Sequence, residues 1–232
     1  MGWLQKITDT ILPADCLVCR DMADTKDNLC ETCRTDLPWL SIACQQCAIP
    51  LSTSLSTRCG ACIKTPPAFD KAVASCHYQT PLLELIHQLK FHAQLAAAAC
   101  LGHLLVTRVV QAYEDDCLPE CILPVPLHPK RCRERGFNQA VEISRISQQK
   151  LNIPMHVSAL QRVQHTPAQR GLSAKSRRRN LKNAFAVQGD LNAKHVVIVD
   201  DVMTTGSTMN QLARLLKDAG VERVDVWCCA RA

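Results

Sequence analysis

Four Cys-x-x-Cys pairs near the start of the chain constrain its folding more strongly than any other feature of the sequence. A gap of two residues lets one tight turn present both thiolates to a tetrahedral ion, at Zn–S distances of roughly 2.3 Å. Two such turns complete a four-thiolate site with no position left for water, so such a site is structural and not catalytic. Residues 14–64 hold little else to fold around, which favours two structural zinc ions. The eight predicted ligands are Cys16, Cys19, Cys30, Cys33, Cys44, Cys47, Cys59 and Cys62.

The sequence argues against two other uses of these cysteines, a redox dithiol and disulfides. A single Cys-x-x-Cys pair is also typical of a redox dithiol, but four pairs at intervals of ten, ten and eleven residues argue against that chemistry. Disulfides would fit the fifteen cysteines of a secreted protein, yet the N-terminal segment "MGWLQKITDTILPADC" lacks the features of a signal peptide. We therefore predict structural zinc in a cytoplasmic protein. The spacing leaves the pairing open: first with second and third with fourth, or crossed.

The positive charge of the chain is concentrated in one segment. Residues 128–182 contain thirteen Lys and Arg against two Glu, a local charge of +11, so the rest of the chain carries −5 of the total of +6. Arginine dominates, which favours bidentate contacts with a polyanion or a phosphorylated ligand. Aromatic residues make up only 4% of the chain, which argues against a stacking surface for bases. The sequence has no run of about 18 apolar residues, so we predict no transmembrane segment.

Changes in composition divide the chain into three predicted parts. A zinc-knuckle module covers 1–68 and ends at two consecutive prolines. A helical connector covers 69–115, where apolar residues at 82, 85, 86 and 89 predict one helix and the stretch 93–113 predicts another. From 116 to 232, short apolar runs alternate with helical stretches. This alternation predicts an α/β domain with a mainly parallel sheet and helices on both faces.

The expected elements of the α/β domain follow from the same patterns. Helices are expected over 138–151 and after residue 208, the latter with Ser207 or Thr208 as its cap and Gly220 at its end. The buried face of that second helix is predicted to consist of Met209, Leu212, Ala213 and Leu216. The apolar runs expected as strands are 121–127, 156–160, 184–187, 195–202 and 224–232.

The segment "VVIVDDVMTTGST", residues 196–208, carries the most specific chemistry. Its continuous apolar run predicts a central strand that is buried on both faces. Two aspartates follow at the carboxyl end, and a loop of small hydroxyl residues then leads into a helix start, which together make an anion cradle. Carboxylates beside a bound phosphate suggest a sugar phosphate, because they accept hydrogen bonds from vicinal hydroxyls. The segment is neither a Walker A loop nor a Rossmann fingerprint.

This segment resembles the phosphoribosyl-pyrophosphate (PRPP) signature of type I phosphoribosyltransferases at every position. Both have four hydrophobic residues, two acids, two hydrophobic residues and a small-residue loop. The resemblance implies a type I phosphoribosyltransferase-like fold, with Asp200 and Asp201 as the catalytic pair that holds the 2′- and 3′-hydroxyls of ribose. It also implies Mg²⁺ with PRPP, and it assigns the 5′-phosphate to Thr204, Thr205, Gly206, Ser207 and Thr208.

More of the chain resembles the ComF-type competence proteins. The Cys-x-x-Cys pairs, "PVPL", "RERGFNQA", "TPAQ…RRRN…AF" and the PRPP signature come in the order found in that family, over nearly the full length. The resemblance implies a role in natural transformation, in which single-stranded DNA is handled as it enters the cytoplasm. It further implies a DNA translocase or helicase as a partner, and a position peripheral to the inner membrane.

Two basic stretches flank the region that PRPP would occupy in such a fold. In a type I fold, the loop after the first strand of the domain is where pyrophosphate and its magnesium lie, and here it carries Arg131, Arg133 and Arg135. The second stretch takes the place of the mobile loop that closes over PRPP in those enzymes. Some of these residues could bind DNA phosphates instead, and the sequence does not divide them. The second stretch contains Arg162, Gln169, Arg177, Arg178, Arg179 and Asn180.

The sequence is therefore consistent with two functions. The first is a competence-associated protein that handles single-stranded DNA and carries a PRPP-binding site. The alternative is a phosphoribosyltransferase that acts on a nucleobase or another small acceptor in salvage metabolism. Such an enzyme needs a hood over the base, and the sequence ends at Ala232 directly after the last expected strand, so the zinc module would have to serve. Whether phosphoribosyl transfer occurs is left open.

Overall fold

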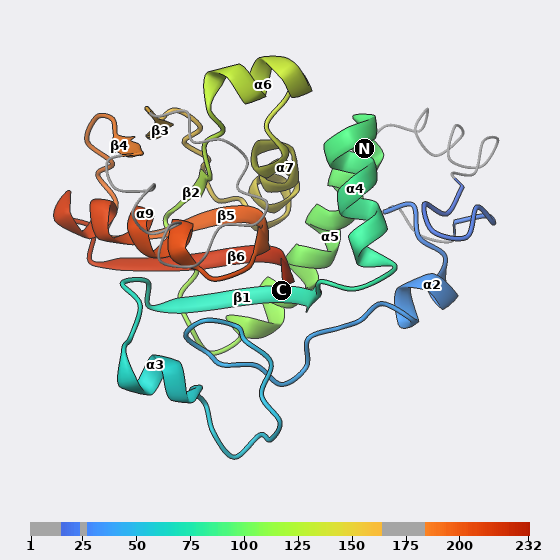
Figure 1. Ribbon diagram of the computed structural model, residues 1–232, viewed down its shortest axis with the longest axis horizontal. Coiled ribbons are helices and arrows are strands. Elements are labelled where there is room, and N and C mark those ends of the chain that lie inside the picture. Colours follow the sequence, from blue (N-terminus) through green and yellow to red (C-terminus); the bar gives the residue numbers. More distant parts are fainter. Residues whose placement is uncertain (1–14, 24–26, 164–183) are drawn as a thin grey trace.

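A parallel β-sheet of four strands forms the centre of the protein (Figure 1). The computed structural model describes residues 15–23, 27–163 and 184–232. The strand order is β1 (Lys71–His77), β6 (Arg223–Arg231), β5 (His195–Met203) and β2 (Cys121–Pro124), and each neighbouring pair is parallel. The predicted α/β class with a mainly parallel sheet is confirmed.

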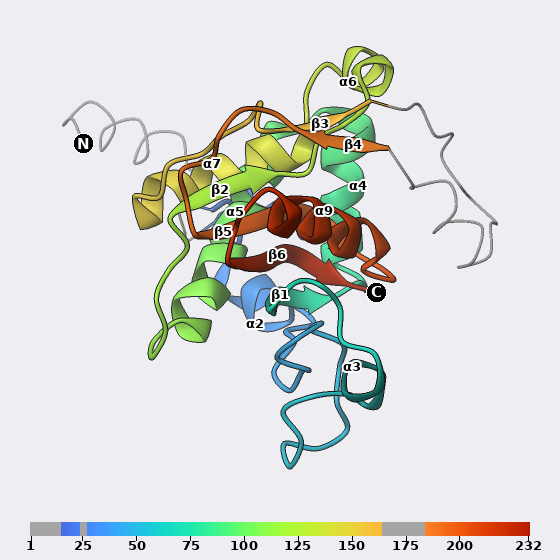
Figure 2. The same cartoon turned by 90° about the vertical axis from the view of Figure 1, so that its left-hand side faces the viewer.

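Helices cover both faces of the sheet (Figures 1 and 2). Val197 and Val199 of β5 point into the core that contains α4 (Leu82–His92), α5 (Leu95–Ala112) and α7 (Gln139–Leu151). Val196 and Ile198 point into the opposite core, which contains α9 (Ser207–Asp218). Because successive strand residues face opposite sides, a strand covered on both faces has to be continuously apolar, and this explains the run of four β-branched residues.

The two helices predicted between the zinc module and the α/β domain are present as α4 and α5. The apolar stripe of α4 is fully buried, and α4 ends at Ala93, which has a φ of 52°. Among the residues that the structure describes, α5 alone is long and apolar enough to cross a membrane. Its apolar residues, such as Leu101 and Leu105, pack in the core, as in the core helix of a folded domain.

Strand β1 differs from the prediction, which has only helices in 69–115. Its interior consists of Ala, Val, Ser and Cys, and alanine and serine give little strand signal on their own. In the structure, β1 pairs with β6, and the Cys-rich segment lies along its other edge. The N–H of Leu40 donates to the carbonyl of Ser75 at 3.0 Å, and the N–H of Ala72 donates to the carbonyl of Gln45 at 3.1 Å. This edge of the sheet is therefore covered.

Smaller differences from the expectations concern short elements. The run 156–160 was expected as a strand, but the strand β3 covers Leu160–Arg162 and pairs antiparallel with β4 (Phe185–Val187), outside the main sheet. A short helix, α6 (Pro129–Arg135), was not expected. The helices α2 (Glu31–Thr35) and α3 (Gly60–Lys64) each begin directly after a cysteine of the zinc module.

The start of α9 also differs from the prediction. Gly206, with a φ of 72°, occupies the N-cap position, and neither Ser207 nor Thr208 caps the helix with its side chain. A residue with positive φ at this point lets the chain turn sharply from the strand into the helix, and glycine adopts it without strain. The predicted end is confirmed, since Gly220 follows α9 with a φ of 96°. The predicted buried face of α9 is confirmed as well.

A buried polar network closes the amino end of the sheet, opposite the aspartates of β5. The Tyr113 hydroxyl donates to Asp225 at 2.7 Å, and the Trp227 indole donates to the Tyr113 oxygen at 3.1 Å. His195 lies 2.8 Å from the same carboxylate. Burial acts to raise the pKa of Asp225, but the hydrogen bonds from His195 and Tyr113 lower it. The polar side chains at this end thus bond to one another. The candidate site lies at the carboxyl end.

Candidate functional site

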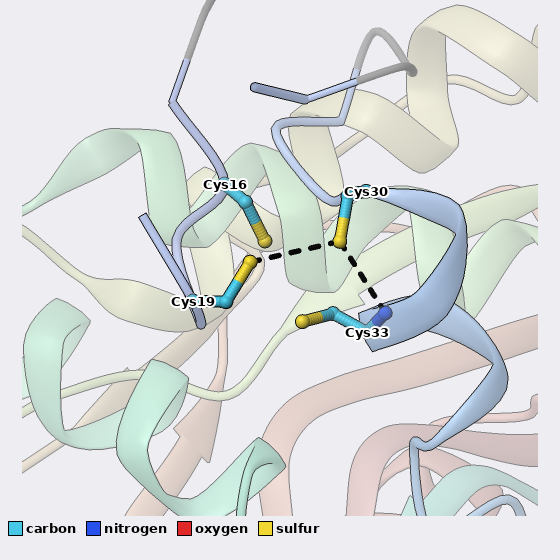
Figure 3. A group of neighbouring side chains, drawn as sticks. All are labelled: Cys16, Cys19, Cys30 and Cys33. Atoms are coloured by element: carbon cyan, nitrogen blue, oxygen red, sulfur yellow. Dashed lines mark hydrogen bonds between the residues drawn. The ribbon is translucent and has the colours of Figure 1, made fainter. Parts of the chain in front are cut away.

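The eight predicted zinc ligands gather into two clusters of four. In each cluster the four sulfur atoms lie within 4.8 Å of one another. The first zinc site consists of Cys16, Cys19, Cys30 and Cys33 (Figure 3). The second zinc site consists of Cys44, Cys47, Cys59 and Cys62. The pairing of the knuckles is therefore sequential, which resolves the alternative that the spacing had left open.

The sulfur geometry fits zinc. The Sγ atoms of Cys19 and Cys30 are 3.7 Å apart, as are those of Cys47 and Cys59. Two thiolates bound tetrahedrally at roughly 2.3 Å would be about 3.8 Å apart. The N–H of Cys33 also points at the Sγ of Cys30, at 3.4 Å (Figure 3). The two clusters fit two structural zinc ions, as the sequence predicts.

One cysteine in each site is readily ionised. Burial raises the pKa of both thiols, but hydrogen bonds from backbone N–H groups outweigh it and lower the pKa of Cys16 to about 6 and that of Cys44 to about 7. Each site therefore already favours a thiolate near neutral pH. A thiolate is the form that binds a metal ion.

The two zinc sites contact opposite faces of the sheet. Cys16 and Cys33 belong to the core that contains α4 and α5, and the Gln88 amide of α4 donates to the carbonyl of Leu17 at 3.3 Å. Cys47 of the second site packs on the other core, which contains α9. A cleft of about 1090 Å³ lies between the second site and the start of α9. Its walls include Cys47, Cys59, Phe69, Phe185, Thr205, Ser207 and Arg231.

The two predicted acids lie at the carboxyl end of β5. Asp201 is 3% exposed and forms an ion pair with Lys90 of α4. Its other carboxylate oxygen accepts a hydrogen bond from the Gln139 amide at 3.3 Å. The N–H of Asp201 donates to the carboxylate of Asp200 at 2.9 Å. Helices α4 and α7 therefore hold Asp201, while Asp200 receives only its neighbour's N–H among these contacts.

The surroundings separate the pKa values of the two acids. Burial and the negative charge of Asp201 raise the pKa of Asp200 well above its usual value. Burial acts in the same direction on Asp201, but the positive charge of Lys90 outweighs it and lowers the pKa of Asp201. One charged and one readily protonated carboxyl group thus lie side by side, as expected of two close carboxylates beside a single cation.

The segment "RERGFNQA" places a further arginine beside the acids. Arg135, at the end of α6, donates a hydrogen bond to the Gln139 side-chain oxygen, and Gln139 in turn donates to Asp201. A single amide therefore links the guanidinium to the carboxylate.

Gly136 and Asn138 provide the backbone turn that this link requires. Gly136 ends α6 with a φ of 86°, and the Asn138 side chain caps α7 by accepting from the N–H of Ala140 at 3.0 Å. The Asn138 amide also donates to the carbonyl of Val125 at 3.0 Å, which fixes the turn to the chain just after β2. These contacts give a physical reason for the glycine and the asparagine in "RERGFNQA".

Two of the predicted arginines, Arg135 and Arg162, lie close to the acids, and Arg131 lies close to these two arginines. Burial lowers the pKa of both Arg135 and Arg162, and so does the positive charge of Arg131, while the negative charge of Asp200 opposes the shift in both. These groups are thus close enough to act on one another. Arg133 is exposed to solvent and does not join them. Gln169, Arg177, Arg178, Arg179 and Asn180 lie outside the described residues.

The small-residue loop follows the acids and leads into α9. The Thr205 and Ser207 hydroxyls lie 2.8 Å apart, and the N–H of Ser207 donates to the Thr205 oxygen at 3.3 Å. Thr204 and Thr205 are exposed, and Gly206, Ser207 and Thr208 are half-buried. The first turn of a helix offers N–H groups that have no acceptor within the helix. The loop therefore combines hydroxyls with the positive end of the α9 dipole, as an anion site requires.

Lys90 and Arg231 were not predicted as site residues. Arg231 is 7% exposed and donates to main-chain oxygens at the start of the loop. A lone arginine in the apolar run "VWCCARA" was a signal that could have been used, because a buried charge must find partners. Lys90 had no comparable signal, since its partner is distant in the sequence.

Two family models match separate parts of the chain. Residues 7–63 match the family model of the double zinc ribbon domain, and residues 138–232 match that of the phosphoribosyl transferase domain. A solved structure of glutamine PRPP amidotransferase from B. subtilis, complexed with ADP and GMP, is similar at a TM-score of 0.36 and 17% identity, covering 55% of this chain and 25% of that chain.

Two curated relatives cover nearly all of the chain. Competence protein F of Haemophilus influenzae is 41% identical over 223 residues, which are 94% of this chain and 96% of the relative. DNA utilization protein YhgH of Escherichia coli O157:H7 is 38% identical over 223 residues, which are 95% of this chain and 98% of the relative. With its double zinc ribbon followed by a phosphoribosyltransferase domain, this chain belongs to the family of Competence protein F and DNA utilization protein YhgH.

Proposed function

We propose that this protein handles incoming single-stranded DNA during natural transformation and binds PRPP at the carboxyl end of its central sheet. The observation that carries the PRPP part is the position of Asp200 and Asp201, which precede a phosphate-binding type of loop and lie close to Arg135 and Arg162. The competence part is supported by the names of the relatives, Competence protein F and DNA utilization protein YhgH.

Each part of the site has a distinct task in this proposal. The vicinal hydroxyls of ribose donate hydrogen bonds to Asp200 and Asp201, and Lys90 keeps Asp201 ionised for this purpose. The 5′-phosphate accepts hydrogen bonds from the loop hydroxyls and from the first turn of α9. Arg131, Arg135 and Arg162 face the pyrophosphate, for which guanidinium groups are suited. Mg²⁺ that arrives with PRPP supplies further neutralisation of the pyrophosphate oxygens.

The DNA-binding part rests on electrostatics. Residues 128–182 carry a local charge of +11, and the chain has too few aromatic residues for a continuous stacking surface. Binding to phosphates through Lys and Arg releases counterions, so the affinity for single strands should fall steeply with salt. We place this activity in the cytoplasm, peripheral to the inner membrane, with a DNA translocase or helicase as the partner.

The alternative function is a phosphoribosyltransferase that acts on a nucleobase or another small acceptor. One observation favours it: the cleft next to Thr205 and Ser207 has the aromatic residues Phe69 and Phe185 in its walls. An acceptor ring could pack against these side chains, and the second zinc site would form the opposite wall. This function predicts that PRPP is consumed when the correct acceptor is added, whereas regulated DNA handling does not require consumption.

The test is a salt series of fluorescence anisotropy with labelled single-stranded DNA, with and without PRPP and Mg²⁺. The triple variant Arg177→Ala/Arg178→Ala/Arg179→Ala should bind more weakly. Its slope of log K against log salt should be smaller by about 2, because each phosphate contact contributes about 0.7 for single strands. PRPP should change the affinity of the wild type.

A matched control removes three positive charges elsewhere. Lys194 and Lys217 each take part in an ion pair at the surface, and Arg58 is exposed; all three lie outside residues 128–182. The triple variant Arg58→Ala/Lys194→Ala/Lys217→Ala has the same net charge as the first, and its slope should remain close to that of the wild type. No DNA binding by the wild type at moderate salt, together with intact PRPP binding, would reject DNA handling and favour the salvage enzyme.

A further inference from the structure

Arg231 is a buried arginine at the carboxyl end of β6, and all its recorded hydrogen bonds go to main-chain oxygens. Its Nε donates to the carbonyl of Cys47 at 3.0 Å. Its Nη1 donates to the carbonyl of Met203 at 3.1 Å and also to the main-chain oxygens of Thr204 and Ala232. Within the described part of the chain, no carboxylate side chain is among these acceptors.

These acceptors belong to two different sites. Cys47 is a predicted ligand of the second zinc site, and its carbonyl lies in the knuckle turn that shapes this site. Met203 and Thr204 form the passage from β5 into the phosphate loop. A single planar guanidinium therefore connects the zinc knuckle to the loop. Because guanidinium donors have a fixed geometry, a shift of the knuckle would disturb the hydrogen bonds at the loop.

A second contact joins the same two regions. Residues that follow α3, the helix that contains the zinc ligand Cys62, contact the loop and the start of α9. There the N–H of Ala68 donates to the Asn210 side chain of α9 at 2.6 Å. The buried Phe69 ring lies so close to Gly206 that a side-chain carbon at that glycine would be 3.8 Å from the ring. The segment directly after the second zinc site therefore also contacts the loop region.

The first zinc site has no comparable connection in the described part of the chain. Its cysteines pack against α4 and α5, and the recorded hydrogen bond from Gln88 to Leu17 ties it to α4. The two zinc sites thus differ in what they support, although their ligand sets are alike. Each serves as a control for the other.

We infer that the second zinc site positions the phosphate loop through Arg231, so that zinc at this site and a sugar phosphate at the loop stabilise each other's binding. This inference rests on the proposed binding of PRPP at the loop. Arg231 acts as a positioning residue, because its contacts are with the loop backbone and the zinc knuckle. Such coupling is reciprocal: if zinc strengthens the binding of the sugar phosphate, the sugar phosphate must strengthen the retention of zinc by the same factor.

Reciprocity provides the experiment. The zinc affinities of the full-length protein are measured by equilibrium competition with a coloured chelator, with and without saturating PRPP and Mg²⁺, and in parallel with ribose 5-phosphate. We expect PRPP to protect one of the two zinc ions by raising its affinity about tenfold, within the usual range of coupling energies. The protected ion is assigned with Cys62→Ser, which removes a ligand of the second site, and Cys33→Ser, which removes a ligand of the first. Protection should be lost in Cys62→Ser and kept in Cys33→Ser.

Arg231→Gln tests the connection itself. It should keep both zinc ions but lose the protection by PRPP, and its affinity for PRPP should fall by a similar factor. Arg231→Lys should restore part of both effects. Equal protection of both zinc ions, or protection that persists in Arg231→Gln, would overturn the inference. Should Arg231→Gln fail to fold, the wild type and the two cysteine variants still decide the question.

The two proposals fail in different ways. If calorimetry shows no PRPP binding to the wild type, the proposed sugar-phosphate site is wrong and the inference fails with it. If PRPP binds but leaves both zinc affinities unchanged, the inference alone is wrong.

Discussion

Lys90 forms an ion pair with Asp201, although the two residues come from different predicted parts of the chain. Lys90 lies near the end of α4, and Asp201 lies at the carboxyl end of β5. The pair supplies a buried carboxylate with the cation that it needs next to a second acid. On its other side, α4 packs in the core that also contains Cys16 and Cys33 of the first zinc site.

Removal of Lys90 should destabilise the protein. Lys90→Met leaves the Asp201 carboxylate buried beside Asp200 without its cation. The loss of one partner from a buried pair costs 3–5 kcal/mol in typical cases, and partial exposure of Lys90 reduces the expected loss to about 2 kcal/mol. Urea denaturation measures the change. Lys90→Met/Asp201→Asn should recover most of the loss, and Lys217→Met, at a surface pair with Asp70, should change the stability by less than about 0.5 kcal/mol.

Asp200→Asn should stabilise the protein at neutral pH. The raised pKa of Asp200 means that the folded protein keeps a proton that the unfolded chain loses above about pH 4, so stability falls as the pH rises through this window. The asparagine variant lacks this loss. Its melting temperature at pH 8 should be higher by about 2–4 °C, as expected for ~1 kcal/mol in a chain of this size. At pH 4 the variant and the wild type should melt together.

An exposed acid on the adjacent helix provides the control for this prediction. Asp218→Asn, at the end of α9, should leave the melting temperature at pH 8 unchanged. Equal melting temperatures of Asp200→Asn and the wild type at pH 8 would contradict the raised pKa of Asp200 in the folded protein.

Gln139→Leu should weaken PRPP binding without affecting zinc. The substitution removes the amide that links Arg135 to Asp201, so both groups lose a defined orientation. We expect the dissociation constant for PRPP to rise by about tenfold, which corresponds to the loss of one charge-assisted hydrogen bond. Titration calorimetry provides the measurement. Gln149→Leu, on the exposed side of the same helix, should bind PRPP like the wild type.

Each zinc site should be lost separately. Cys33→Ser and Cys62→Ser each remove one thiolate from one cluster, so the zinc content measured by mass spectrometry should fall from about two ions per chain to about one. Cys117→Ser provides the control, because Cys117 is exposed and outside both clusters. Loss of both zinc ions, or of neither, from either variant would contradict two independent four-cysteine sites.

Local sequence patterns predict much of the fold. The apolar run before Asp200 and the small-residue loop after Asp201 are contiguous, so a strand, two acids and a helix start could be predicted together. Strand β1 escaped prediction because its alanines and serine gain strand character only from burial between β6 and the zinc ribbon. The cap of α9 was assigned to a hydroxyl residue, but the sharp turn out of β5 requires the backbone freedom of Gly206 instead.

The sequence predicts only part of the candidate site, because the site is assembled from segments that are far apart in the sequence. The two acids and the loop carry a local signature. Lys90 and Arg231 acquire their roles from packing, the first because α4 lies against the carboxyl end of β5, and the second because β6 ends beside the second zinc site. No spacing rule connects such residues in a single sequence. The sequential pairing of the cysteine knuckles likewise depended on the path of the chain between them.

The most direct test of the proposed sugar-phosphate site is a calorimetric titration of PRPP with Mg²⁺ into the zinc-loaded wild type and into Asp200→Asn/Asp201→Asn. We predict one PRPP bound per chain of the wild type. The double variant should keep both zinc ions and its fold but bind PRPP at least about 100-fold more weakly, because two acceptors for the ribose hydroxyls are lost. Equal binding by the two proteins, or no binding by the wild type, would contradict the assignment of this end of the sheet to PRPP.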